Sequence, residues 1–379
     1  MAKTSSQTIH IVFLLALALV SSPVYADEPI DYFFNGAKSY KAPYVAVLPP
    51  AQKIKELKKS SLIDGEIKNK LDDILDGTPS GGLAVLAINN GEIVYERYAR
   101  SDEKNLYPSW SMAKSITALT LGYALCDGKI KSLDDLAENY SEELKGTVWG
   151  KSKIVDLLTM SSGASQKTLD KTTGDYHPHN PASLHYILKS GQISLKEAFT
   201  KYSKLDGANP PGTIFSYNNM DTQALSSVIE GATGVSFPEY FQGTLWENVG
   251  AQFESVWYLD KNKQALSSAY FFSTMRDHGR LAQIVVDAHQ GKLSNKCLET
   301  YIKDATTHKR STGGSSWYGY QFWLGPIRTN LPIVKMIGHQ GQEIFINYKN
   351  GKIIVLTAHS SALREKYRDP SNLFPWLLN

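Results

Sequence analysis

The stretch from residue 108 to residue 117 reads Pro108-Ser109-Trp110-Ser111-Met112-Ala113-Lys114-Ser115-Ile116-Thr117. Positions i and i+3 share one face of a helix, so the hydroxyl of Ser111 and the amine of Lys114 can meet. A serine hydroxyl becomes a good nucleophile only when a base takes its proton. A lysine that is partly removed from water, with a lowered pKa, can be that base. The spacing therefore makes Ser111 a candidate nucleophile and Lys114 its candidate base.

The residues after Ser111 predict a strongly apolar helix, because hydrophobic side chains stand at positions 116, 119, 121, 123, 124 and 125 before Asp127-Gly128 ends it. Ser111 would then lie at the positive end of the helix dipole. An ordinary helix N-cap with an exposed lysine is the alternative interpretation. A second Ser-x-x-Lys, from Ser101 to Lys104, stands in a charged, turn-like stretch with no apolar helix behind it. We interpret that second copy as solvated surface.

The first 26 residues are typical of a secretory signal peptide. Lys3 is the only charge before an apolar core at residues 11–20, and Val24-Tyr25-Ala26 is a small-x-small cleavage site. The core is too short for a membrane span, so we expect cleavage near Ala26 and a secreted or periplasmic protein without a stable membrane span. An uncut anchoring helix is the alternative.

Charge and composition exclude some classes of partner. The 379 residues carry a net charge of +3, which falls to +2 when Lys3 is removed with the signal peptide. This near-neutral balance gives no reason to expect nucleic acid or an anionic surface as a partner. A hydrophobic share of 42% fits a well-packed globular enzyme. We expect a small-molecule substrate, and the oligomeric state is left open.

Two cysteines and a group of histidines are the candidates for a cross-link or for metal ligands. Cys126 and Cys297 could pair in an exported protein, but spacing cannot show it, and we expect Cys126 to be a small buried hydrophobic residue. No Cys/His cluster has zinc-like spacing, and the histidines at 177, 179 and 185 suit a surface loop. The sequence therefore predicts neither a metal nor an organic cofactor.

The pattern of elements predicts an α+β protein. Residues 82–88 and 92–98 form two strands around an Asn-Gly turn, residues 111–290 are mainly helical, and strands return at 317–323, 343–348 and 353–357 before a terminal helix at 361–378. Residues 27–50 look irregular, and residues 165–192 form a long polar loop. We expect an antiparallel sheet built from both chain ends and flanked by helices, with a mainly helical inserted domain. The expected division is a signal peptide at 1–26, a sheet domain at 27–105 and 310–379, and a helical domain at 106–309.

Two further motifs carry groups suited to catalysis. Tyr217 and Asn219 follow a Pro-Pro-Gly turn at residues 210–212 and supply a phenol and an amide. Gly338-His339-Gln340-Gly341-Gln342 precedes a strand, and a backbone N–H after the second glycine could point at a reacting carbonyl. A packing tyrosine and a plain glycine turn are the alternatives.

Ser-x-x-Lys, then Tyr-x-Asn, then His-x-Gly resembles the order of motifs in the serine β-lactamase and penicillin-binding protein superfamily. Within it, the chain is similar to the class C-like branch that includes 6-aminohexanoate-dimer hydrolases, esterases and D-aminopeptidases. Four segments, 109–115, 157–163, 212–219 and 338–342, look like family blocks in the family order, and the resemblance covers about residues 80–360. It implies a β-lactamase/transpeptidase-like fold, an α/β sandwich.

The resemblance implies a role for each motif residue. Ser111 would be acylated, Lys114 would activate it, Tyr217 would relay the proton to the leaving group, and Asn219 would orient Lys114 and the substrate. The backbone N–H groups of Ser111 and Gln342 would form the oxyanion hole, with His339 and Gly341 supporting the substrate. Tyr176, in the long polar loop, resembles the lid tyrosine of the 6-aminohexanoate-dimer hydrolases.

One departure from the family pattern bears on the substrate. The third motif is His339-Gln340-Gly341 where penicillin-recognising members have Lys-Thr-Gly, and a mostly neutral histidine meets a carboxylate less well than a lysine does. No carboxylate stands out as a separate deacylating base, and Asp221 is a candidate only by its nearness in sequence.

We therefore expect an exported serine hydrolase that acts through an acyl-enzyme on a small ester or amide. A β-lactamase or D-alanyl-D-alanine carboxypeptidase, an acyltransferase, and a non-catalytic envelope ligand-binding module are the alternatives.

Overall fold

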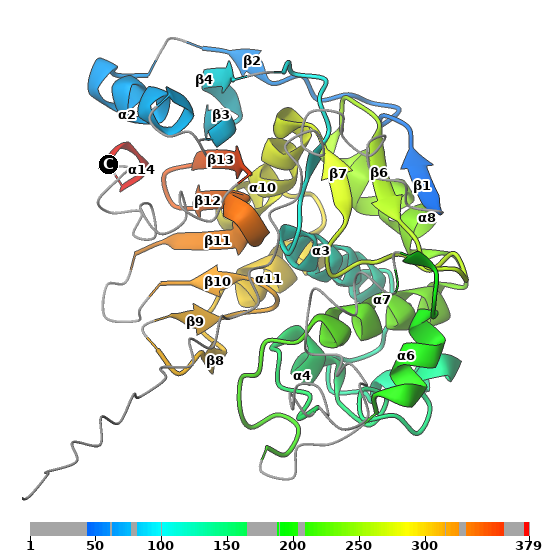
Figure 1. Ribbon diagram of the computed structural model, residues 1–379. Helices are drawn as coiled ribbons and strands as arrows, with labels where there is room; N and C mark the ends of the chain where they lie inside the picture. The colour runs from blue at the N-terminus through cyan, green and yellow to red at the C-terminus, as the bar shows by residue number, and fades with distance from the viewer. Residues whose placement is uncertain are drawn as a thin grey trace, which may run out of the picture.

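Both ends of the chain contribute to the larger of two sheets, as the sequence predicts. The computed structural model describes residues 44–60, 63–76, 82–99, 101–164, 188, 190–203, 209–314, 316–325, 331–359 and 375–378. The nine strands of this sheet lie in the order β2-β4-β3-β13-β12-β11-β10-β9-β8 (Figure 1). Their bounds are β2 Lys58–Lys59, β3 Gly82–Asn89, β4 Glu92–Tyr98, β8 Arg310–Ser311, β9 Trp317–Tyr318, β10 Trp323–Leu324, β11 Ile333–Ile337, β12 Glu343–Asn347 and β13 Lys352–Ala358. All neighbours are antiparallel except β2 and β4.

The predicted Asn-Gly hairpin joins β3 to β4. Asn90 and Gly91 both have positive φ, 47° and 84°, as a two-residue hairpin turn requires. Along β3 the side chains alternate between two cores: Leu86 and Ile88 belong to the larger one, whereas Val85 and Ala87 belong to the smaller one. The central strands of the sheet are therefore covered on both faces.

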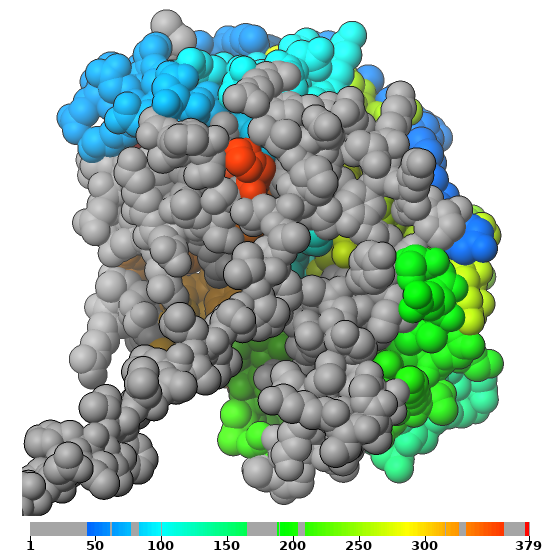
Figure 2. All heavy atoms as spheres, viewed as in Figure 1, coloured from blue at the N-terminus to red at the C-terminus, as the bar shows by residue number. Residues whose placement is uncertain are grey.

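Helices cover both faces of this sheet (Figure 1). On one face lie α2 (Gly65–Asp76) and α14 (Pro375–Leu378), and on the other lie α10 (Met275–His289) and α11 (Lys296–Ala305). Figure 2 shows the same view with all atoms, in which helix α2 (light blue) and the region of α6 (Leu195–Lys201, green) lie at opposite ends of the molecule. The α+β prediction is confirmed by this arrangement.

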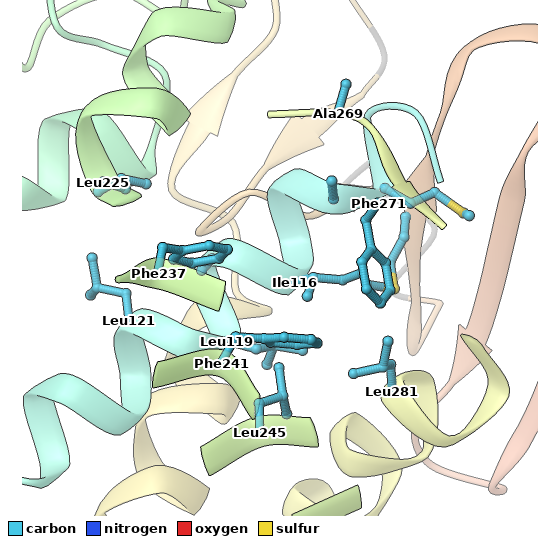
Figure 3. Close-up of a cluster of buried hydrophobic side chains, with 14 of the residues drawn as sticks. Ile116, Leu119, Leu121, Leu225, Phe237, Phe241, Leu245, Ala269, Phe271 and Leu281 are labelled. Atoms are coloured by element: carbon cyan, nitrogen blue, oxygen red, sulfur yellow. The ribbon is translucent and has the colours of Figure 1, made fainter. Parts of the chain in front are cut away.

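Helix α3 (Met112–Cys126) lies between the large sheet and the remaining helices. Every residue from Met112 to Ala124 is buried, so no face of this part of the helix meets water. Its apolar side chains pack against α7 (Asn219–Thr233) and α8 (Phe237–Phe241) and against other residues such as Phe271 and Leu281 (Figure 3). The other helical elements of the described residues are α4 Ile154–Leu158, α6 Leu195–Lys201, α7 Asn219–Thr233, α8 Phe237–Phe241, a π-helical turn at Gln242–Trp246, α9 Glu247–Val249 and three short 3₁₀ turns. This burial gives the start of α3 a rigid base.

A second sheet of four short strands lies where the sequence predicted irregular or helical structure. Its order is β1-β6-β7-β5, with bounds β1 Val45–Leu48, β5 Tyr107–Pro108, β6 Ser255–Tyr258 and β7 Phe271–Ser273. The expectation of an irregular leader at 27–50 is therefore wrong for residues 45–48. All four residues of β6 are buried, so the strand shows no alternation of polar and apolar side chains that sequence reasoning could detect.

Other predicted elements differ in extent. The single strand expected at 317–323 is two short strands, β9 and β10, separated by a turn that buries Gln321. Of the terminal helix expected at 361–378, the described part is α14, and residues 360–374 lie outside the described residues. The proposed division into domains stays a prediction. Segments assigned to different domains do contact each other: β1 pairs with β6, α10 contacts strands β3, β12 and β13 of the large sheet, and α11 contacts α10. Among the described helices, none combines the length and the hydrophobicity that a membrane-spanning segment needs.

Cys126 and Cys297 form a disulfide, with their Cα atoms 5.7 Å apart. The expectation that Cys126 acts as a small buried hydrophobic residue is therefore wrong. The physical reason is the contact between α3 and α11: the Tyr301 hydroxyl donates to the Ala118 carbonyl at 2.8 Å. A Cβ on Gly122 would lie only 2.5 Å from the Tyr301 ring. This close packing brings the last residue of α3 beside the second residue of α11.

Replacing both cysteines by alanine is expected to destabilise the fold. The bond closes a loop with a sequence separation of 171, and by loop-closure entropy such a cross-link stabilises by up to about 5 kcal/mol. Urea unfolding of the Cys126→Ala/Cys297→Ala protein should show this loss, and dithiothreitol should affect the wild type alone. A double variant as stable as the oxidised wild type would contradict the prediction.

Candidate active site

Ser111 and Lys114 lie at the start of α3 with their functional groups in contact. Lys114 Nζ donates to Ser111 Oγ at 3.0 Å. Ser111 has helical backbone angles (φ −67°, ψ −3°) and its side chain caps no backbone N–H. Ser111 is half-buried, whereas Lys114 is only 1% exposed. The alternative of an N-cap with an exposed lysine is therefore wrong for this segment.

The surroundings of Lys114 favour its neutral form. Burial lowers the pKa of Lys114 well below its usual value of 10.5. Its second hydrogen-bond acceptor is the backbone carbonyl of Ser268, at 2.7 Å. Among the described residues, no carboxylate forms an ion pair with this amine. A neutral amine in contact with a hydroxyl can accept its proton.

The second Ser-x-x-Lys copy lies on the surface, as predicted. Ser101 Oγ is hydrogen-bonded to the Tyr107 hydroxyl, and Lys104 is exposed in the turn between β4 and β5. No helix follows this copy, so the two side chains have no buried scaffold. It provides a matched control for substitutions at Ser111 and Lys114.

Tyr217 comes from a distant part of the sequence to the same place. Lys114 Nζ lies 5.1 Å from the centre of the Tyr217 ring. Asn218 caps α7 by accepting from the Met220 N–H at 2.9 Å, and Asn219 is the buried first residue of that helix. Both Asn219 and Lys114 are described, and the structure contains no hydrogen bond between them. The expected orienting contact is provided instead by the Ser268 carbonyl.

The Gly338–Gln342 turn lies against the segment that carries Ser111. A Cβ on Gly338 would stand 2.4 Å from the Ser109 carbonyl, so only glycine allows this approach. The exposed His339 ring lies edge-on to Trp110, with centroids 5.6 Å apart. The Gln342 N–H makes only a long 3.4 Å turn contact with the His339 carbonyl, which leaves it as a weakly engaged donor. Tyr176 lies outside the described residues.

Several non-glycine residues with left-handed backbone conformations surround the candidate site. Trp110 (φ 44°) directly precedes Ser111, and Gln340 (φ 56°) lies in the Gly338–Gln342 turn. Tyr270 (φ 54°) lies two residues after Ser268, whose carbonyl binds Lys114. Each such conformation costs of order 1–3 kcal/mol and persists only where the surroundings enforce it. Three of the seven such residues in the described part of the chain therefore lie in the segments next to the Ser111–Lys114 pair.

Asp221 is a structural group. Its carboxylate accepts from Ser162 Oγ at 2.7 Å and from Trp149 Nε1 at 3.0 Å. The side chain is fully buried, and burial raises its pKa to about 7. These bonds fasten α7 to the turn after α4, so the carboxylate is occupied in holding the fold together.

Sequence reasoning missed two buried glutamines. The Gln321 side chain donates to the carbonyls of Leu157 and Leu158 and accepts from Thr222 Oγ1 at 2.8 Å, while its own carbonyl accepts from Ser115 Oγ. It thereby ties α3, α4 and α7 together. Gln223 contacts the chain around Ser268. Neither residue stands in a recognisable motif. The only sequence signal for Gln223 is its position, one helical turn after Asn219.

Three other aromatic rings lie close to Tyr217. Phe215 and Trp323 are half-buried, and Tyr318 is buried behind them. The Tyr217 ring lies 5.5 Å from that of Trp323 and 6.4 Å from that of Tyr318, between centroids. These side chains form an apolar surface next to the candidate site. Among the described residues, no group of three His, Cys, Asp or Glu side chains could hold a metal ion.

Comparison with known proteins places these features in a family. The chain is 23% identical over 288 residues to the 6-aminohexanoate-dimer hydrolase of Paenarthrobacter ureafaciens, which covers 72% of this chain and 71% of that protein. A solved structure of a Bacillus anthracis protein named as a candidate 6-aminohexanoate-dimer hydrolase superposes with a TM-score of 0.76 at 22% identity, covering 93% of this chain and 96% of that one. A class C beta-lactamase in complex with cefoxitin gives a TM-score of 0.58 at 17% identity, covering 81% and 99%.

The order of motifs, the sheet built from both chain ends and these likenesses agree with one another, and the resemblance inferred from the sequence is confirmed. The family model described as Beta-lactamase matches residues 67–372. The chain belongs to the beta-lactamase family.

Proposed function

We propose that this protein is an exported serine hydrolase that cleaves a small ester or amide through an acyl-enzyme on Ser111. The observation that carries the proposal is the 3.0 Å contact between Ser111 Oγ and the Nζ of a buried lysine. The relatives named as hydrolases support the reaction class.

In the first half-reaction, neutral Lys114 takes the proton of the Ser111 hydroxyl while Oγ attacks the substrate carbonyl carbon. The backbone N–H groups of Ser111 and Gln342 donate to the oxyanion of the tetrahedral intermediate. The Tyr217 phenol, next to the lysine, passes a proton to the leaving alcohol or amine as the carbonyl re-forms. Ser111 is then an ester of the acyl group.

In the second half-reaction, water attacks this ester and gives a proton to the Tyr217–Lys114 pair. Collapse of the second tetrahedral intermediate releases the acid and returns the proton to Ser111 Oγ. The involvement of Asn219 rests on its buried place at the start of α7, from which its amide can contact the substrate.

A small ester or a short linear amide suits the surroundings best. His339 stands where penicillin-recognising relatives have a lysine, which weakens the case for a β-lactamase or a D-alanyl-D-alanine carboxypeptidase. The half-buried rings of Phe215 and Trp323 offer an apolar surface for an acyl chain next to Tyr217. The Cys126–Cys297 disulfide supports export, because such bonds persist in oxidising compartments.

Mass spectrometry of the exported protein after treatment with a fluorophosphonate tests the proposal. We expect one adduct, on the peptide that carries Ser111, with loss of p-nitrophenyl ester hydrolysis and no adduct on Ser101. The intact mass should correspond to cleavage near Ala26. Absence of an adduct would favour the non-catalytic ligand-binding module. Product analysis with an added alcohol or amine separates hydrolysis from acyl transfer.

A further inference from the structure

We propose that Gln223 is a positioning residue for Lys114, acting through the turn formed by residues 265–268. The inference rests on the proposed function, in which Lys114 is the base. The hydrogen bonds of the Gln223 side chain go to residues 265, 267 and 268 and not to Ser111 or Lys114. It acts by fixing the carbonyl that Lys114 binds.

Gln223 holds residue 268 from its amino side. Its Oε1 accepts from the Ser268 backbone N–H at 2.6 Å and from the Ser267 hydroxyl at 2.8 Å, while its Nε2 donates to the Ala265 carbonyl at 3.3 Å. Gln223, Ser267 and Ser268 are all fully buried. Because the Gln223 amide binds three groups of this turn, it fixes both the position and the orientation of the turn.

The nucleophile helix holds the same turn from the other side. Thr117 Oγ1 lies 2.9 Å from the Ser267 carbonyl and 3.0 Å from the Ala113 carbonyl. Two residues beyond Ser268, Tyr270 has a left-handed backbone and packs its ring against Trp110, with centroids 5.4 Å apart. The turn is therefore clamped between α7 and α3.

Holding this turn affects Lys114, because the carbonyl group of residue 268 is a hydrogen-bond acceptor of the lysine amine. The Ser268 carbonyl accepts from Lys114 Nζ at 2.7 Å. A neutral amine has two N–H bonds and one lone pair, so donation to Ser268 limits how the amine rotates about its last carbon. With one N–H held by Ser268, the amine can turn either its second N–H, as in the structure, or its lone pair toward Ser111 Oγ, 3.0 Å away. The orientation with the lone pair toward Oγ is the one that accepts the Ser111 proton. If the carbonyl moved, the amine would turn and the proton acceptor would be lost.

The position of Gln223 on α7 couples this carbonyl to the other proposed site groups. Asn219 and Gln223 are four residues apart on the same helix and so share a face. Tyr217 lies two residues before the first residue of this helix. Gln223 therefore fixes the Ser268 carbonyl, which accepts from Lys114, relative to the helix that brings Tyr217 and Asn219 to the site.

Gln223→Met tests the proposal, because methionine keeps the volume and removes the amide. We expect kcat for p-nitrophenyl acetate and the rate of fluorophosphonate labelling to fall about thirtyfold, since a misplacement of about 1 Å can cost about a hundredfold. KM should stay within about threefold of the wild type, because the fully buried Gln223 side chain is not exposed to bind substrate. Gln223→Glu retains an acceptor oxygen and should recover most of the rate.

Asn347→Leu is the matched control. Asn347 is also a buried amide, but it bonds the Leu377 carbonyl at the far side of the large sheet. It should lower the thermal midpoint comparably while leaving kcat within about twofold. Equal loss of kcat in both variants, or a wild-type kcat in Gln223→Met, would overturn the proposal. If Gln223→Met does not fold, Thr117→Val loosens the same turn, and a wild-type labelling rate in that variant would overturn it instead. Failure of the wild type to label would reject the proposed function itself.

Discussion

Ser111→Ala is expected to abolish turnover while leaving the fold intact. The alanine removes the only oxygen at this position that can carry the acyl group, so no acyl-enzyme can form. For comparable serine enzymes, loss of the nucleophile lowers kcat by as much as about 10⁶. The Ser111 hydroxyl caps no backbone group, so the thermal midpoint should change little. The measurement is kcat for p-nitrophenyl esters together with thermal unfolding.

Ser101→Ala is the control for this experiment, because it changes the serine of the second Ser-x-x-Lys copy, whose lysine is exposed. It should keep kcat close to the wild-type value. Appreciable ester hydrolysis by Ser111→Ala, with the same substrate specificity as the wild type, would defeat the assignment of the nucleophile.

Lys114→Met is expected to lower kcat by about 10²–10⁴, the usual contribution of a positioned acid–base group. Methionine fills a similar volume but cannot accept the Ser111 proton. Lys114→Arg should be equally inactive, since a guanidinium stays protonated. Lys104→Met, at the exposed copy of the motif, should be unaffected.

The pH profile gives a second readout of Lys114. Burial lowers the pKa of this amine, so its neutral form is present at lower pH than that of an exposed lysine. As the pH falls through this lowered pKa, the amine becomes an ammonium and kcat/KM should fall. The residual activity of Lys114→Met should lack this acidic limb. If the limb were retained unchanged, another group would be the base.

The candidate pair was predictable from the sequence because its signal is local. One helical turn separates Ser111 from Lys114, and the apolar residues that follow predict the buried helix that brings the two groups together. The β3–β4 hairpin was equally predictable, because Asn90-Gly91 is a turn signal confined to two residues. Local patterns of this kind require no knowledge of the tertiary structure.

The second acceptor of Lys114 could not be predicted. It is a backbone carbonyl, and main-chain groups are common to every residue, so only the tertiary fold selects Ser268. The long-range bonds of Gln223 and Gln321 likewise depend on how the turns at 265–268 and 319–321 return to α7 and α4. A buried glutamine has the same appearance in a sequence as an exposed one.

The Cys126–Cys297 bond and the smaller sheet were missed for a related reason. Each joins segments far apart in the chain: α3 to α11 in one case, and residues 45–48 to 255–258 in the other. The short strands of the smaller sheet carry no periodic pattern, and no local pattern shows that α3 and α11 lie side by side.

Trapping of the acyl-enzyme tests the central claim most directly. The wild-type protein is mixed with p-nitrophenyl acetate, quenched in acid within the first turnover, and its peptides are weighed by mass spectrometry. The account predicts the mass of one acetyl group on the peptide that contains Ser111 and no acetyl group in Ser111→Ala. Either of two results would contradict it. One is hydrolysis of the ester at the full wild-type rate with no acetyl group on Ser111 at any quench time or pH, and the other is an acetyl group on another residue.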